Sequence, residues 1–359
     1  MSPQEFASPK SCCIFRLSAL GDITHVLPLL RALQDAWPAC EFTWIIGKRE
    51  QQLVNDIKGV RFIVFDKRAG KAALRQFKQQ MQRESFDILL HLQTSLRANL
   101  MSRYVRAQRR IGWDSSRARE GHRWVVNEQI KERAPQHQVQ GFLAFARYLG
   151  IDVTQPRWDL PISAQAQQFA AKHMTGSKPW LVISPCSSHA LRDWPLSHYQ
   201  AIARFACEVL EMQVMVCGGP SPREREYGTG IAQAHPSIVN FVGKDTLPQL
   251  LALLQRAAIV VSPDSGPAHM ASAVGTPVIG LHAATWSQRS GPYRSLDYCV
   301  DAFEQAALQF KRKPAQQLRW GQRIETAGVM NLVSVEAVKT KLQSLHQDLF
   351  HASSAPPNE

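Results

Sequence analysis

Several patterns that mark common classes of site are missing from this sequence. None of the 7 cysteines stands in a C-x-x-C pair or at zinc-ligand spacing to a histidine, and several lie in apolar runs, as buried thiols do. No apolar stretch approaches the roughly 20 residues of a membrane helix, and residues 1–10 lack the apolar core of a signal peptide. We therefore expect a cytoplasmic protein without a transmembrane segment.

Acidic residues are also scarce. The chain has 29 Asp and Glu against 42 Lys and Arg, which gives a formal net charge of +13. Such a balance predicts attraction to a polyanion, which can be a nucleic acid, an anionic membrane face or a phosphorylated substrate. Charge alone does not choose among these.

Strand and helix patterns alternate along the 359 residues, which favours an α/β fold with parallel sheets and two doubly wound domains. The alternation of strands and helices is interrupted by a proline- and glutamine-rich stretch and then resumes. We predict an N-terminal domain at 1–160, a connector at 161–178, a C-terminal domain at 179–332, a helix at 333–350 and a disordered tail at 351–359.

The first motif follows the first predicted strand and places Asp22 in the first turn of a helix. One interpretation is a carboxylate that complements the helix N-terminus. The other is a general base, because a carboxylate at a strand end can reach a substrate hydroxyl. A G-x-G-x-x-G pattern is missing here, which argues against a dinucleotide site.

The second motif follows the first strand of the second half. It contains Ser187, Ser188 and Arg192, two hydroxyls and a guanidinium that together could hold a diphosphate. Either serine could instead be an ordinary helix cap or loop residue.

The third motif places Gly218 and Gly219 after a buried strand, with Glu224 and Glu226 close behind. Glycines let a ligand approach the backbone, and a following carboxylate can bind a ribose diol. The spacing leaves both glutamates open for that role.

The fourth motif, S-P-D-S-G-P-A-H, lies between two apolar runs and reads as a strand, a turn and a helix start. Backbone N–H groups and the helix dipole favour an anion at such a place. Asp264, Ser265, Gly266 and His269 could cradle a phosphate, or Asp264 could only cap the helix while His269 fills its face.

Taken in order, these motifs resemble glycosyltransferase family 9, which contains the ADP-heptose:lipopolysaccharide heptosyltransferases. The resemblance rests on R-L-S-A-L-G-D-I-T-H, S-S-x-x-x-R-x-W-P, G-G-P with nearby glutamates, and D-S-G-P-A-H before G-T-P-V-I-G-L, and it runs from about Cys12 to about Tyr293. It implies a GT-B fold, with two Rossmann-like domains facing a central cleft, an N-terminal acceptor domain and a C-terminal nucleotide-sugar domain.

The resemblance also implies roles for particular residues. Asp22 matches the proposed catalytic base, and Arg192 stands where a lysine is common in the family, which keeps the charge and adds a bidentate fork. Glu224 is preferred to Glu226 for the ribose contact. The expected donor-binding residues are Ser187, Ser188, Arg192, Glu224, Asp264, Ser265, Gly266 and His269.

The implied reaction is an inverting transfer, in which an acceptor hydroxyl attacks the anomeric carbon while ADP leaves from the opposite face. No D-x-D sequence occurs, which favours a site without a metal ion or other cofactor, where fixed positive groups stabilise the leaving diphosphate.

Arginines concentrate between residues 97 and 133, within the expected acceptor domain. Any single one reads as solvated surface, but the cluster favours an acidic acceptor such as the Kdo residue of lipid A-Kdo at the inner membrane face, which an enzyme bound peripherally to its cytoplasmic side could reach. The expected acceptor-binding residues are Ser18, Gly21, Arg97, Arg117 and Arg119.

Alternative functions remain open at this point. A related GT-B enzyme could use a heptose acceptor or another nucleotide sugar. A nicotinamide-dependent oxidoreductase would want the missing G-x-G-x-x-G pattern. A basic nucleic-acid-binding protein is suggested only by charge, since aromatic-basic, helix-turn-helix and zinc-knuckle patterns are lacking, so we expect no nucleic-acid partner.

Overall fold

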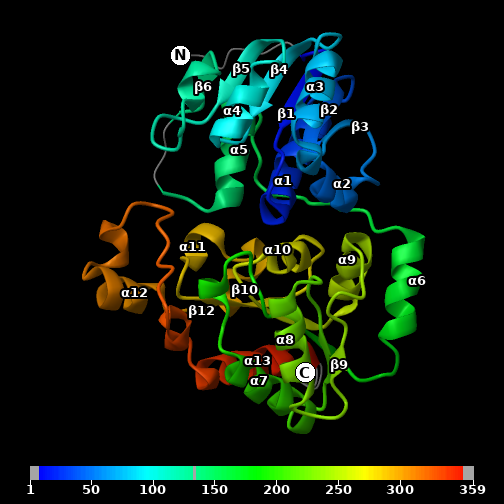
Figure 1. The fold of residues 1–359 in the computed structure, drawn as a ribbon, viewed down its shortest axis with the longest axis vertical. Helices are drawn as coiled ribbons and strands as arrows, with labels where there is room; N and C mark the ends of the chain where they lie inside the picture. Colours follow the sequence, from blue (N-terminus) through cyan, green and yellow to red (C-terminus); the bar gives the residue numbers. More distant parts are fainter. Residues whose placement is uncertain (1–7, 132–134, 351–359) are drawn as a thin grey trace, which may run out of the picture. The chain divides into compact units, whose positions relative to one another are not determined.

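The computed structural model describes residues 8–131 and 135–350, so the tail expected at 351–359 lies outside the described residues. The chain divides into two compact units, Met1–Pro161 and Ile162–Glu359. Each unit contains one six-stranded sheet in which all paired strands run parallel (Figure 1). The prediction of two doubly wound α/β sheets is confirmed.

The first unit alternates strands and helices from its start. Its strand order is β3-β2-β1-β4-β5-β6, so the order reverses between β1 and β4. Its elements are β1 (Ser11–Phe15), α1 (Leu20–Ala36), β2 (Glu41–Gly47), α2 (Lys48–Val54), β3 (Val60–Phe65), η1 (Lys67–Ala69), α3 (Gly70–Met81), β4 (Phe86–His91), α4 (Leu96–Ser102), β5 (Ala107–Gly112), η2 (His122–Trp124), β6 (Glu128–Gln129) and α5 (Gln138–Tyr148).

The central strand β1 is buried on both faces. Cys13 and Phe15 pack into a core formed with residues of α3 and α4. Cys12 and Ile14 face the other way, because side chains alternate along a strand, and they are equally buried. An apolar run covered on both sides is typical of a parallel sheet.

The second unit repeats this topology. Its strand order is β12-β11-β10-β7-β8-β9, and the order reverses between β7 and β10. Its elements are α6 (Ala164–His173), β7 (Trp180–Ile183), η3 (Ala190–Arg192), α7 (Leu196–Glu208), β8 (Gln213–Val216), α8 (Pro222–Ala232), β9 (Val239–Asn240), α9 (Leu247–Arg256), β10 (Ile259–Pro263), α10 (Gly266–Ala273), β11 (Val278–His282), α11 (Ser287–Ser290), η4 (Tyr293–Tyr298), β12 (Val300–Asp301), α12 (Phe303–Ala306), η5 (Ala307–Lys311), η6 (Ala315–Gln317), η7 (Val329–Leu332) and α13 (Val335–Phe350).

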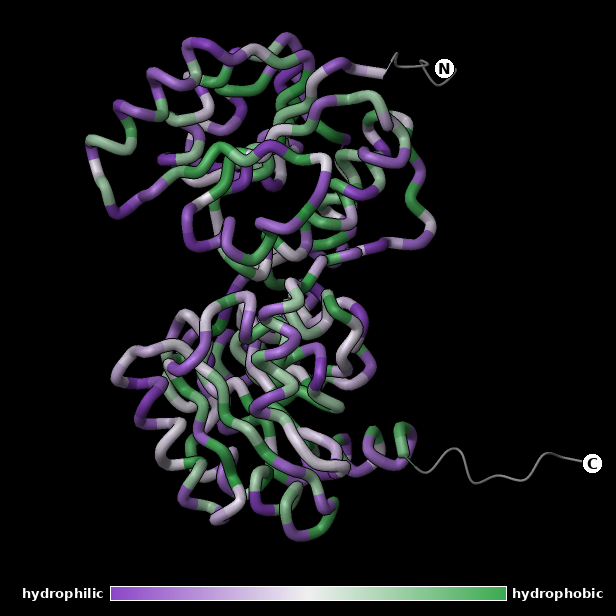
Figure 2. Tube along the Cα trace, turned by 90° about the vertical axis from the view of Figure 1, so that its right-hand side faces the viewer, coloured by the Kyte–Doolittle hydropathy of each residue, from purple (hydrophilic) through white to green (hydrophobic). Residues whose placement is uncertain are grey.

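One segment of the second unit differs in detail from the sequence interpretation. The stretch at 161–178, expected to be a connector, contains helix α6, which packs against α9 and belongs to the second unit. The terminal helix α13 packs beside α7 (Figure 1). In each unit the hydrophobic, green parts of the trace lie mainly toward the interior and the hydrophilic, purple parts toward the outside (Figure 2).

In open parallel sheets, ligands bind beyond the carboxyl ends of the strands, at the point where the strand order reverses. For the first unit this point lies beyond β1 and β4, and for the second unit beyond β7 and β10. The segments that leave these four strands are therefore where the candidate residues have to be sought.

Candidate active site

Asp22 lies beyond the end of β1, in the first turn of α1. Its Oδ2 atom forms an ion pair with Nη2 of Arg16, the residue that directly follows β1, and also accepts a long hydrogen bond of 3.5 Å from the Ala19 N–H. The carboxylate thus complements the helix N-terminus and is also held by a guanidinium. Ser18 and Gly21 belong to the same turn, and the Gly21 carbonyl accepts a hydrogen bond from Thr24.

Arg16 is itself fixed on several sides. Its Nη1 donates to the Leu92 carbonyl at 2.6 Å, and its guanidinium lies 5.6 Å from the centre of the Phe142 ring. Gln93, beyond β4, accepts from the Leu17 N–H at 2.8 Å and so ties the two strand ends together. The order of the strands reverses here, so Asp22 is held rigidly at the expected ligand-binding end of the sheet.

The three candidate arginines of the first unit differ in their surroundings. Arg117 pairs with the buried Asp114 and stacks on Trp113 at 4.6 Å. Burial raises the pKa of Asp114, but hydrogen bonds from Ser116 and Arg117 outweigh it, so the pKa is lowered. Arg97 and Arg119 are exposed. Arg117 is therefore committed to a structural pair, whereas the other two can reach an anion.

Arg97 and Arg119 come from elements that hydrogen bond to each other. The Leu96 N–H at the start of α4 donates to Glu120, and the Asn99 amide donates to the Arg119 and Glu120 carbonyls at 3.1 and 2.8 Å. Helix α4 and the 119–121 loop are thus one connected piece of surface.

Two buried histidines complete this connection. The Asn99 Oδ1 atom accepts from His91 Nε2 and His122 Nδ1, each at 3.0 Å, so both histidines carry their protons there. His122 Nε2 then accepts from the Trp113 N–H at 3.0 Å. Burial lowers the pKa of His91 well below its usual value and that of His122 to about 4, so both rings are neutral near pH 7. No motif in the sequence indicated this network.

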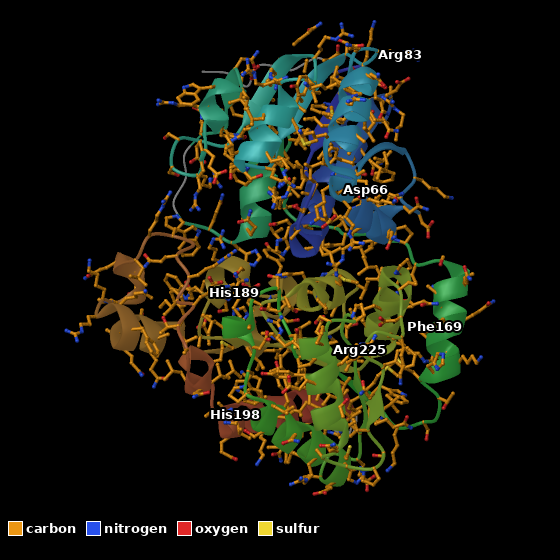
Figure 3. The ribbon with its side chains drawn as sticks, in the orientation of Figure 1. Asp66, Arg83, Phe169, His189, His198 and Arg225 are labelled. Atoms are coloured by element: carbon orange, nitrogen blue, oxygen red, sulfur yellow. The ribbon has the colours of Figure 1, made fainter. Side chains whose placement is uncertain are left out.

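In the second unit, the loop after β7 holds Ser187 tightly. The Ser187 N–H donates to Asp193 Oδ1 at 2.7 Å, and its hydroxyl donates to the His189 carbonyl at 2.9 Å. Arg223 of α8 pairs with Asp193 at 3.2 Å and donates to the Ser187 carbonyl at 2.5 Å. Ser188 is exposed on this loop and precedes His189, which is labelled in Figure 3.

Arg192 follows on the same loop, in the 3-10 helix η3. Its side chain is only 9% exposed, and its Nε and Nη2 atoms donate to one oxygen of Glu325 at 2.7 and 2.6 Å. Burial raises the pKa of Glu325, but the hydrogen bond and charge of Arg192 outweigh it, so the pKa is lowered. This contact uses one edge of the guanidinium, and the Nη1 side remains for a second anion.

The structure separates the two candidate glutamates. Glu224 folds back over the glycine turn, where its carboxylate accepts from the Gly219 N–H at 2.7 Å and from the Ser221 hydroxyl at 2.5 Å. Glu226 is exposed on α8. Burial, and less strongly the charge of Glu224, raises the pKa of the neighbouring Asp245 to about 7.

Asp264 lies where β10 passes into α10. Its two oxygens accept from His269 Nε2 at 3.2 Å and from the Ser290 hydroxyl at 3.0 Å. Burial raises the pKa of Asp264, but the hydrogen bond and charge of His269 and the charges of His282 and Arg192 together outweigh it, so the pKa is lowered. Asp264 is therefore an ionised carboxylate that holds two other side chains in place.

Ser265 and Gly266 form the start of α10. The Ser265 hydroxyl lies 2.7 Å from that of Ser262, which donates to the Ser184 carbonyl at 2.9 Å. This chain of contacts links the ends of β10 and β7, the two strands between which the order reverses. The Arg192 loop and the Asp264 turn are therefore joined at one edge of the sheet.

A shallow hollow lies next to this edge. It is bounded by α11 and by the segment before η7, and Ser290 is shared between the hollow and the Asp264 contact. The residues that line it include Thr285, Trp286, Arg289, Ser290, Leu318, Gln322 and Arg323.

Comparison with known proteins now decides the family. The model of glycosyltransferase family 9 (heptosyltransferase) matches residues 74–318. The lipopolysaccharide core heptosyltransferase OpsX of Haemophilus influenzae is 38% identical over 339 residues, which cover 94% of this chain and 97% of OpsX. The chain belongs to glycosyltransferase family 9. It is accordingly an enzyme, a glycosyltransferase of a heptosyltransferase family, as the motifs predicted.

Other relatives and solved structures agree with this assignment. Lipopolysaccharide heptosyltransferase 1 of Escherichia coli K12 is 24% identical over 285 residues, covering 76% of this chain and 87% of that protein. A family 9 glycosyltransferase from Veillonella parvula superposes with a TM-score of 0.76 at 19% identity, covering 94% and 97% of the two chains. Escherichia coli heptosyltransferase WaaC with ADP gives 0.72 at 22% identity, covering 93% and 99%. The expected GT-B fold is confirmed.

Some residues that shape the candidate site were not expected from the sequence. Arg16 holds Asp22, Glu325 holds Arg192, Ser290 holds Asp264, and Asp193 holds the Ser187 loop. Arg16 belongs to the R-L-S-A-L-G-D-I-T-H motif, six residues before Asp22, so this spacing could have pointed to it as a partner of the candidate base. Within residues 8–131 and 135–350, no helix has the length and apolar character needed to cross a membrane.

Proposed function

We propose that this family 9 enzyme transfers a heptose from ADP-heptose to a Kdo residue of the lipopolysaccharide inner core. Support comes from OpsX, which is named a lipopolysaccharide core heptosyltransferase, and from WaaC, whose structure was solved with ADP. Within the structure, the observation that carries the proposal is Arg192, a deeply buried guanidinium at the point where the second sheet reverses its order.

The second unit would hold the donor. The Nη1 side of Arg192, the hydroxyls of Ser187 and Ser188 and the backbone N–H groups at Ser265 and Gly266 would bind the diphosphate, where helix N-terminus and guanidinium both favour negative charge. Asp264 would keep His269 and Ser290 in place beside it, because both are hydrogen-bonded to its carboxylate. Glu224 would meet the ribose diol at the glycine turn.

Asp22 would act as the general base. Arg16 and the Ala19 N–H both bind Oδ2, so Oδ1 is the oxygen assigned to the acceptor proton. As the acceptor oxygen bonds to the anomeric carbon, its proton passes to Oδ1, the bond from that carbon to the phosphate oxygen breaks, and ADP leaves from the opposite face. The configuration at the anomeric carbon is inverted.

Fixed cations would take the place of a metal ion at the leaving diphosphate. Arg192 supplies a permanent charge in a nearly dry position, where electrostatic stabilisation of a leaving anion is strongest. The nearby carboxylates already serve protein groups, since Asp264 binds His269 and Ser290 and Glu224 binds Gly219 and Ser221. We expect transfer to persist in a chelator such as EDTA.

Arg97 and Arg119 are the best placed of the candidate arginines for the acidic acceptor, and Ser18 and Gly21 form the turn beside the base. Other basic residues lie at the ends of β2 and β3, where Lys48 pairs with Asp66 (labelled in Figure 3) at 2.9 Å and Lys67 and Arg68 follow that aspartate. The acceptor would be reached on the cytoplasmic side of the inner membrane, with the enzyme bound peripherally.

A transfer assay tests the proposal. The protein is incubated with ADP-heptose and Kdo-lipid A, with and without a phosphate on the Kdo, and the product is detected by mass spectrometry. We expect one heptose to be added. Transfer only to an acceptor that already carries heptose would replace the acceptor assignment, and transfer only from another nucleotide sugar would replace the donor.

A further inference from the structure

The outer face of the α4 region carries unusually exposed apolar side chains. Leu96 and Leu100 of α4 are 55% and 53% exposed, Tyr104 is 38% exposed and Trp124 of η2 is 78% exposed. Leu96 and Leu100 are four residues apart, so they lie on the same face of the helix. The opposite face of α4, which includes Ala98 and Met101, is buried in the core.

These side chains belong to one surface because their elements are tied together. The start of α4 hydrogen bonds to Glu120, and Asn99 binds the carbonyls of Arg119 and Glu120. The Trp124 indole lies against Gly121, the residue after Glu120. A Cβ atom added at Gly121 would lie only 2.9 Å from the indole ring. Trp124 is thus anchored to the loop that contacts the start of α4.

The same surface is strongly basic. Residues 96–124 include 8 arginines and only 2 acidic residues, Asp114 and Glu120. Asp114 is paired with Arg117, and Glu120 binds the Leu96 N–H. The exposed arginines of this stretch are Arg97, Arg103, Arg106, Arg119 and Arg123, of which Arg106 donates to the Gln82 and Glu84 carbonyls.

Exposed aromatic and leucine side chains with arginines nearby are typical of protein surfaces that lie in the headgroup layer of an anionic membrane. Indole and phenol rings suit the boundary between headgroups and acyl chains, and arginines bind the lipid phosphates. The guanidinium of Arg123 lies 5.6 Å from the Trp124 ring and Lys78 lies 4.5 Å from the Tyr104 ring, so cations and rings are already adjacent.

We infer that the outer face of α4 together with η2, defined by Leu96, Leu100, Tyr104 and Trp124, docks the enzyme onto an anionic lipid bilayer. A symmetric dimer through this face would bring the arginines of two copies close together, and their repulsion argues against a second copy of the chain as the partner. The inference rests on the proposed function only in that a lipid-linked acceptor gives the contact a purpose. Arg97 and Arg119, the acceptor-binding candidates, lie on its border.

Vesicle flotation of the full-length protein, without any donor, tests the surface. We expect binding to phosphatidylcholine vesicles that contain phosphatidylglycerol and much weaker binding to phosphatidylcholine alone. A Leu100→Ser/Trp124→Ser variant should lose at least tenfold in partitioning. An Arg103→Gln/Arg123→Gln variant should lose about fivefold for each arginine, the equivalent of about 1 kcal/mol each.

A matched control uses exposed residues of the second unit. Val209 is 60% exposed and Arg204 is exposed on α7, so Val209→Ser/Arg204→Gln removes similar groups elsewhere and should bind vesicles like the wild type. Circular dichroism and thermal unfolding check that each variant is folded. Lipids brominated in their acyl chains should quench part of the tryptophan fluorescence of the wild type, and Trp124→Phe should lose that quenching while still binding.

The outcomes separate this inference from the proposed function. Vesicle binding that is unchanged in both surface variants, or a wild type that does not bind anionic vesicles, would overturn it, whatever the transfer assay shows. A dimer that dissociates in the Leu100→Ser/Trp124→Ser variant without a loss of vesicle binding would assign the face to a second copy. If the inference holds, this variant keeps transfer to a deacylated acceptor and loses transfer to one embedded in vesicles.

Discussion

Replacing Arg192 with alanine removes the cation that we place at the leaving diphosphate. The guanidinium is 9% exposed and uses Nε and Nη2 for Glu325, so its second edge is available to a phosphate. A charge-assisted hydrogen bond contributes about 1.5–3 kcal/mol, so its loss should raise the dissociation constant for ADP roughly 10- to 150-fold. Isothermal titration calorimetry with ADP measures this directly.

The loss should depend on Glu325. In Arg192→Ala the Glu325 carboxylate keeps its charge beside the diphosphate but loses its partner, so repulsion adds to the missing contact. The Arg192→Ala/Glu325→Gln double variant should therefore bind ADP more tightly than Arg192→Ala alone. Arg192→Lys, which keeps the charge but not the planar fork, should fall between alanine and the wild type.

A control and a stability measurement complete this test. Arg204→Ala removes an exposed arginine from α7 of the same unit and should leave ADP binding unchanged. Thermal unfolding should show a modest loss of stability for Arg192→Ala, because Glu325 is partly exposed and can be hydrated when its partner is gone. Wild-type ADP affinity in Arg192→Ala, with the variant folded, would refute the assignment of Arg192 to the donor.

Three further predictions concern the residues around the site. Arg16→Met should lower kcat on the order of 10- to 100-fold while leaving the ADP dissociation constant unchanged, since it orients the Asp22 carboxylate, and Arg16→Lys should keep more activity; equal loss of ADP affinity would contradict this. Glu224→Gln should weaken ADP binding about tenfold in calorimetry, while Glu226→Gln should not, and the reverse result would exchange their roles. The pKa of Asp264 is depressed in the folded protein, so its ionised form adds stability above the usual carboxyl range, and this stability is lost as the pH falls. Below about pH 4, the free energy of unfolding measured with denaturant should therefore decline less steeply for Asp264→Asn than for the wild type. Parallel declines would contradict the pKa shift.

The fold could be predicted from the sequence because local patterns and tertiary structure agree. The apolar run around Cys12 and Ile14 forms a strand buried on both faces, and glycines and serines mark the turns that follow the strands. Helix α6 was missed because its glutamine- and alanine-rich sequence is only weakly amphipathic and is stabilised by its packing on α9. Strand β9 has two residues, too few for a periodic pattern.

The candidate site could be predicted only in part. Motifs pointed to Asp22, Arg192 and Asp264 as candidates because Asp264 directly follows β10 and the other two lie in the segments that leave β1 and β7. The side chains that hold them come from elsewhere in the chain, as Glu325 does, 133 residues from Arg192. Such pairs depend on tertiary packing, which no local spacing records. The network of His91, Asn99 and His122 was missed for the same reason.

The central claim is that Asp22 takes the acceptor proton while the second unit holds the donor. Asp22→Asn keeps the size and shape of the side chain but removes its basicity, so single-turnover transfer from ADP-heptose should fall about 10²- to 10⁴-fold. The dissociation constant for ADP should stay within about twofold of the wild type. Transfer at the wild-type rate, or a parallel loss of ADP affinity, would contradict the assignment of Asp22 as the base.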